Sequence, residues 1–138
     1  MRRLVLAVAA VVVIAAGLSV HTFAPDGFAS DAAGDALYAA LIHLLVAFLA
    51  PRWPSWRSGS VAVAWCVAIE LFQVTGLPAQ WGAAFRPLML VFGTVFSASD
   101  LVFYALGIGA AAAVDVIIRC RGRGSRTHRT SGSDTTER

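Results

Sequence analysis

The sequence predicts an all-α integral membrane protein with four transmembrane helices in a single domain. Hydrophobic residues make up 58% of its 138 residues and charged residues only 14%, a balance far from that of an ordinary soluble domain. Four apolar runs occur, at 4–20, 36–50, 61–77 and 101–118. Each is close to the length of about 20 residues that a helix needs to cross a bilayer.

The first two apolar runs need separate arguments. Arg2 and Arg3 before the run at 4–20 also suit a secretory signal peptide. The run is longer than a signal core, and residues 19–24 contain no small-x-small cleavage site, so we expect an uncleaved first span. The run at 36–50 is short, and we expect its ends to complete a span.

The arginines predict the orientation, since short cytoplasmic loops collect Arg and Lys. All 11 basic residues are Arg, and all but Arg86 gather at residues 2–3, in the connection at 51–60 and in the tail from 119 onward. The connection at 21–35 has three Asp residues and no Arg. We therefore expect both termini in the cytoplasm and a multi-pass protein of the cell membrane.

Two segments fall outside the four spans. Residues 78–99 are too apolar for open solvent, and a fifth span there would break the charge pattern, so we expect an interfacial or re-entrant segment. Residues 119–138 are rich in Arg, Gly, Ser and Thr. They predict a disordered basic cytoplasmic tail that lies against anionic lipid, after a membrane domain at 1–118.

Polar side chains are costly inside lipid, so the few that occur there are the candidate site. Glu70 and Gln73 share one face of the third span, and Asp100 and Tyr104 share one face of the fourth. Arg86 lies between them and is expected to neutralise a carboxylate or an anionic headgroup. These five residues form the predicted ligand site in the outer half of the membrane. Structural alternatives are interhelical hydrogen bonds at Glu70 and a helix-end role for Asp100.

Other buried polar or small residues have structural interpretations. His43 is mid-span, where it is either a proton relay or a histidine bonded to a neighbouring helix. Asp115 and Arg119 are spaced for a local ion pair. Gly107 and Gly109 favour close helix packing.

Several functional classes lack support. The sequence has no phosphate-binding glycine loop, no His-Glu-x-x-His, no nucleophile elbow and no Cys-x-x-Cys. Cys66 and Cys120 lie in unlike settings, so they are no disulfide pair, although acylation of Cys120 stays open. The tail has no aromatic residues among its arginines, which disfavours nucleic acid. We expect no enzyme, metal or cofactor.

Motifs in this chain resemble those of a family of small bacterial membrane proteins, domain of unknown function 2809, and more remotely the VanZ-like family. The resemblance rests on Gly34-Asp35-Ala36-Leu37-Tyr38, Glu70-Leu71-Phe72-Gln73, Trp81, Arg86, Gly93, Phe96, and Asp100 with Tyr104 and Gly107. The VanZ-like pattern has Asn where this chain has Tyr104. This similarity implies a bacterial inner-membrane protein with a role in the envelope and assigns no reaction.

Three functions follow as hypotheses. The first is binding of a polar or anionic, lipid-linked envelope ligand at the outer leaflet, with membrane lipids as partners. The second is a small proton-coupled transporter that uses Glu70 and His43 and forms a homo-oligomer to enclose a path. The third is a lipid-headgroup enzyme with Glu70 or Asp100 as general base, which needs a nucleophile or metal that the sequence lacks.

Overall fold

The computed structural model describes residues 2–93 and 97–130, with side chains through Cys120. The described residues form helices and no strand, which confirms the all-α class. The helices are α1 (Arg2–Phe23), α2 (Phe28–Leu49), α3 (Ser55–Gln73), α4 (Leu77–Ala84), α5 (Pro87–Phe92) and α6 (Asp100–Thr130).

Three of these helices are long and apolar enough to cross a membrane: α1, α2 and the Asp100–Cys120 part of α6. The 22 residues of α1 or α2 extend about 33 Å, which matches a hydrocarbon core of about 30 Å. Helix α3 meets the same criteria only together with α4, across a bend of 83°. The chain therefore has three candidate spans, or four if the bent pair is one.

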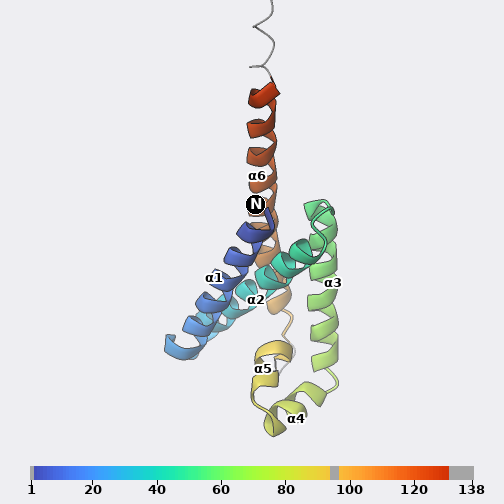
Figure 1. Ribbon diagram of the computed structural model, residues 1–138. Coiled ribbons are helices and arrows are strands. Elements are labelled where there is room, and N and C mark those ends of the chain that lie inside the picture. The colour runs from blue at the N-terminus through green and yellow to red at the C-terminus, as the bar shows by residue number, and fades with distance from the viewer. Residues whose placement is uncertain (1, 94–96, 131–138) are drawn as a thin grey trace, which may run out of the picture.

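Helix α2 occupies the centre of the arrangement (Figure 1) and contacts α1, α3 and α6. Helix α3 also packs on α6, and α4 packs on α3 and α5. Two buried clusters combine small side chains, Ala and Cys, with larger ones. One joins α1 to α2, and the other joins α2, α3 and α6 through Ala39, Ala62, Cys66, Tyr104 and Ile108. Small residues at helix contacts are typical of packing in lipid, where backbones must come close to gain dispersion energy.

The outward faces of the helices carry large apolar side chains. Val11 is 65% exposed, Leu71 63% and Leu106 61%, while polar His43, Glu70 and Asp115 are buried. A soluble protein has the opposite distribution, because exposed apolar area costs about 25 cal/mol per Å² in water. These faces suit contact with lipid tails.

Gly107 permits the closest approach of two helices. A Cβ atom there would collide with the backbone carbonyl oxygen of Ala36, so α6 lies against α2 backbone to backbone. A Cβ at Gly109 would meet open space. The prediction of close packing is thus confirmed at Gly107 and wrong at Gly109, because Gly109 faces away from α2.

The second helix begins earlier than the sequence predicts, at Phe28 rather than at residue 36. Asp31 and Asp35 therefore lie within α2 and not in a loop. Hydropathy alone places the start of the apolar run after these carboxylates. A carboxylate in the first turn of a helix, such as Asp31, is nevertheless favoured by the N-terminal peptide dipoles. The early start also supplies the length that the run at 36–50 lacks.

Two further boundaries differ from the prediction. Helix α3 covers Ser55–Gln73 rather than 61–77, since it starts directly after Pro54 and stops before Gly76, whose φ is +71°. Helix α6 continues to Thr130, where disorder is predicted from 119 onward. Adding residues to an existing helix costs far less than starting one. The rest of the predicted tail, 131–138, lies outside the described residues, as does Phe96.

The segment predicted to be interfacial or re-entrant contains α4 and α5. Three aromatic rings attach it to α3: Phe72 lies 5.4 Å from Trp81 and 5.8 Å from Phe92 between ring centroids, and Trp81 lies 6.3 Å from Phe92. Such edge-to-face rings contribute packing beyond their buried area. The described part of this segment is therefore folded onto the end of α3, and its place relative to a membrane stays a prediction.

Candidate functional site

The helix group has two chemically different ends. We call the basic end the one where α1 begins, with Arg2, Arg52, Arg57 and Arg119. The acidic end is the one where α1 ends and α2 and α6 begin, with Asp26, Asp31, Asp35 and Asp100. The two ends are separated by the length of the spanning helices, so each is described by itself.

At the basic end a buried carboxylate is fully paired. Asp115 of α6 is 0% exposed and accepts bonds from Arg2 Nε at 3.0 Å and Arg2 Nη2 at 2.9 Å. Arg119 Nε donates to it at 2.9 Å, and the Ser55 hydroxyl also donates to it. The predicted Asp115–Arg119 ion pair is confirmed, and Arg2 adds a partner from the other end of the chain.

The same two guanidinium groups also bind backbone carbonyls. Arg2 Nη1 donates to the carbonyl of Pro51 at 2.6 Å, and Arg119 donates to the carbonyl of Trp53. The bonds join α1, the α2–α3 connection and α6. A buried charge that is paired and hydrogen-bonded in this way stabilises a particular arrangement, because breaking one bond leaves another group unsatisfied. We therefore assign this cluster a structural role, in which it holds α1 and α6 to the α2–α3 connection.

At the acidic end Glu70 of α3 is also satisfied. The Tyr104 hydroxyl donates to Glu70 Oε1 at 2.7 Å, and the Ser97 backbone N–H donates to Oε2 at 3.3 Å. Glu70 is 2% exposed. It therefore connects α3 to the start of α6 and fixes the ring of Tyr104.

Gln73, one turn further along α3, is only partly satisfied. Its Nε2 donates to the carbonyl of Phe92 at 2.8 Å, which sets the orientation of the amide. Its Oε1 is buried and has no hydrogen-bond partner among the described residues. An unpaired buried acceptor costs about 1–3 kcal/mol, so such an atom is a natural contact for a ligand or water.

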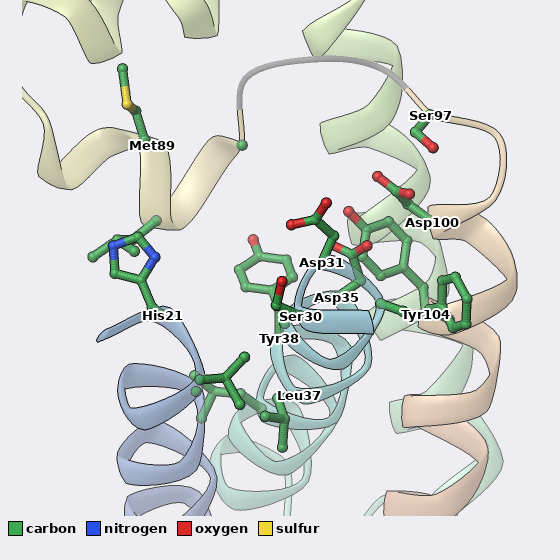
Figure 2. Close-up of a pocket in the computed structure, with 18 of the residues that line it drawn as sticks. His21, Ser30, Asp31, Asp35, Leu37, Tyr38, Met89, Ser97, Asp100 and Tyr104 are labelled. Atoms are coloured by element: carbon green, nitrogen blue, oxygen red, sulfur yellow. The ribbon is translucent and has the colours of Figure 1, made fainter. Parts of the chain in front are cut away.

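A pocket of about 830 Å³ opens at the acidic end, lined by residues of α1, α2, α5 and α6 together with Gln73 of α3. Figure 2 shows Asp31, Asp35, Asp100 and Tyr104 gathered at one side and His21 at the other. Asp35 and Asp100, on different helices, lie close enough for their charges to interact. The remaining wall is apolar and includes Val13, Ile14, Leu18, Leu37 and Leu41. The pocket thus combines carboxylates with a hydrocarbon surface.

The structure brings together only part of the predicted site. Gln73, Asp100 and Tyr104 line the pocket, whereas Glu70 lies behind Tyr104 and outside the lining. Arg86 is exposed and makes no ion pair with any residue in the described ranges. The expected pairing of Arg86 with Glu70 or Asp100 is therefore absent there, because Arg86 caps α5, a surface helix without a buried residue.

Sequence reasoning missed the α2 side of the pocket. Asp31, Asp35 and Tyr38 all line it, but the second span was expected to begin only at residue 36. Two signals could have found them: the spacing of four between Asp31 and Asp35, which places both on one helical face, and the motif from Gly34 to Tyr38.

His43 lies between the two ends, buried among α2, α3 and α6. It is 0% exposed, and neither ring nitrogen has a partner among the described residues. The hydroxyl of Ser58, also buried, has none either. The expected hydrogen bond from His43 to a neighbouring helix is thus absent from the described part of the chain.

Other ligating groups are scattered. Among the side chains described, those of residues 2–93 and 97–120, no three His, Cys, Asp or Glu converge in a way that could hold a metal ion. Cys66 is buried and Cys120 exposed, and both are free thiols.

The fold and the pocket define a class of small all-helical proteins with several membrane-compatible helices and a polar cavity at one end. Within that class, a family model described as "Protein of unknown function (DUF2809)" matches residues 24–108, more than half of the chain. The chain belongs to this family. The matched part contains the α2, α3, α5 and α6 sides of the pocket and omits all of α1 and Asp115. No solved structure matches the chain.

Proposed function

We propose that this protein spans the bacterial inner membrane four times, with both termini in the cytoplasm, and that it binds an amphipathic, lipid-linked envelope ligand in the acidic-end pocket. In this arrangement the spans are α1, α2, the bent pair α3–α4 and α6. The arginines at the basic end then face the cytoplasm, as the positive-inside rule requires. The acidic end, with its pocket, lies at the outer leaflet.

The observation that carries the proposal is the composition of the pocket wall. Ile14 and Leu18 of α1 line the pocket, and they are 44% and 51% exposed. An acyl chain in the pocket would lie against these exposed apolar side chains. Asp35 and Asp100 stand where a headgroup would meet them. A water-soluble ligand would not need the apolar wall.

A matched pair of glycine substitutions tests binding. Gly17 lines the pocket, and a Cβ atom there would meet no other atom within 4 Å, so Gly17→Phe introduces a ring at the pocket wall. Gly109 also faces open space but lies outside the pocket, so Gly109→Phe is the control. Native mass spectrometry of the purified variants should show co-purified lipid lost from Gly17→Phe and retained by Gly109→Phe. Equal lipid retention by both variants would contradict the proposal.

Orientation has its own test. With Cys66 and Cys120 replaced by Ser, Gly27→Cys places one thiol at the acidic end and Arg52→Cys places one at the basic end. A membrane-impermeant maleimide should label Gly27→Cys in intact spheroplasts and label Arg52→Cys only after lysis. The reverse pattern would place the pocket in the cytoplasm.

A second candidate function, proton-coupled transport by a small homo-oligomer, is favoured by His43. Its ring has no hydrogen-bond partner among the described residues and lies between the paired Asp115 and the Glu70–Tyr104 pair, where a proton relay would need a titratable group. Proton uptake by proteoliposomes that disappears with His43→Leu and with Glu70→Gln would favour transport over binding alone. Uptake unaffected by either substitution would remove this candidate.

A further inference from the structure

We infer that the acidic-end pocket selects a lipid whose headgroup carries a primary ammonium, such as phosphatidylethanolamine, over one whose headgroup is anionic. This inference rests on the proposed function, since it names the chemistry of the ligand for the same pocket. It reverses the sign of the anionic ligand that the sequence suggests, because Arg86 does not line the pocket.

The first argument is charge. Asp26, Asp31, Asp35 and Asp100 line the pocket, and none of the described lining residues is Arg or Lys. Asp26 and Asp31 are exposed and solvated, but Asp35 and Asp100 are half-buried and close to each other. Two facing carboxylates beside an apolar wall repel each other and lose hydration. A cation between them would relieve both costs, whereas a phosphate or carboxylate would increase them.

The second argument is hydrogen-bonding capacity. The buried Oε1 of Gln73 accepts nothing from the described residues, and its side chain lies at the pocket wall. The Tyr104 hydroxyl already donates to Glu70, so only its acceptor capacity remains. Together with the carboxylates, this side of the pocket offers acceptors. An ammonium group offers three donors and no acceptor, which complements such a wall.

The third argument is where the donors of the pocket lie. The Tyr38 hydroxyl accepts from Trp65 Nε1 at 2.9 Å and keeps its own proton to donate. His21 stands across the pocket from Asp100 (Figure 2). A zwitterionic headgroup could therefore place its ammonium between Asp35 and Asp100 and its phosphodiester toward Tyr38 and His21. A purely cationic ligand would leave these donors unused.

The test compares three lipids with identical acyl chains on the full-length protein in detergent, by native mass spectrometry titration. Phosphatidylethanolamine should bind about tenfold more tightly than phosphatidylglycerol or phosphatidylcholine, because a charge-assisted hydrogen bond corresponds to at least that factor. Phosphatidylcholine keeps the positive charge but has no N–H donor, so equal binding of it would overturn the hydrogen-bonding argument. Free phosphoethanolamine binding as tightly as the lipid would overturn the lipid assignment.

Variants tie the preference to the pocket. Asp35→Asn and Gln73→Leu should each abolish the preference for phosphatidylethanolamine, while exposed Arg86→Ala should leave it unchanged. Because Gln73→Leu also loses the bond to Phe92, Gly17→Phe serves as the variant that keeps every side-chain bond. If the protein prefers phosphatidylglycerol and Gly17→Phe abolishes that binding, this inference is wrong but the proposed function is still supported. If Gly17→Phe does not change lipid binding, both this inference and the proposed function are wrong.

Discussion

The basic end and the acidic end of the helix group both contain carboxylates, but only the carboxylate at the basic end is paired with arginines. At the basic end Asp115 is fully buried and accepts bonds from Arg2, Arg119 and Ser55. At the acidic end Asp35 and Asp100 lie close together on one side of a cavity whose described lining contains no Arg or Lys. The complete pairing of Asp115 indicates a role in the fold, whereas Asp35 and Asp100 are the carboxylates to which the proposed ligand would bind.

The strongest test of this contrast is Asp115→Asn. The substitution keeps the shape of the side chain but removes the charge that two guanidinium groups share, so we expect the free energy of unfolding to fall by about 3 kcal/mol. Equilibrium unfolding in mixed micelles with rising dodecyl sulfate, followed by tryptophan fluorescence, measures it. Exposed Arg52→Ala is the control and should change little. A loss no larger than that of the control would mean that the cluster does not hold α1 to α6.

The junction between the two ends gives the next largest effect. Gly107→Ala places a methyl group against the carbonyl of Ala36, so α6 must move away from α2, at a cost of about 2 kcal/mol. Gly109→Ala, which faces open space, should be neutral or slightly stabilising because alanine favours helix. The same unfolding assay compares the two. Equal effects would show that the close approach of α2 and α6 is not a feature of the native fold.

A smaller effect is expected where the acidic end is itself paired. Tyr104→Phe removes the donor to Glu70 Oε1 and leaves the Ser97 N–H as the bond to that carboxylate, so stability should fall by about 1 kcal/mol. Glu70→Gln should cost less than this, since the amide oxygen can accept from the Ser97 N–H while the amide NH2 group donates to the Tyr104 hydroxyl. Were Glu70→Gln the more costly of the two, the charge of Glu70 would matter for the fold and the assignment of a purely hydrogen-bonding role would be wrong.

The smallest predicted effect has the opposite sign. Asp35→Asn relieves repulsion from Asp100 at a half-exposed position and should raise the free energy of unfolding by about 0.5 kcal/mol. The same chemical change therefore destabilises at Asp115 and stabilises at Asp35. Unfolding of both variants side by side measures the sign, and a clear loss of stability with Asp35→Asn would mean that the acidic end is a structural cluster like the basic one.

The candidate site was predictable on one side only. The polar faces of α3 and α6, with Gln73, Asp100 and Tyr104, follow from helical periodicity, which depends on local spacing alone. The contribution of α2 did not, because hydropathy places the start of that helix after its first carboxylates. Arg86 was assigned to the site through its charge, and the direction in which a short surface helix points cannot be derived from composition.

By itself, the sequence determined the all-α class, the polar positions within apolar runs, the separation of basic from acidic connections and the membership of its family. These properties depend on residues near one another in the chain, where the hydrophobic run and the helical repeat act. Only the tertiary structure decided which charges are satisfied. Arg2 reaches Asp115 across 113 positions and Tyr104 reaches Glu70 across 34. Such pairs depend on which helix faces meet, and that is set by close approaches such as the one at Gly107.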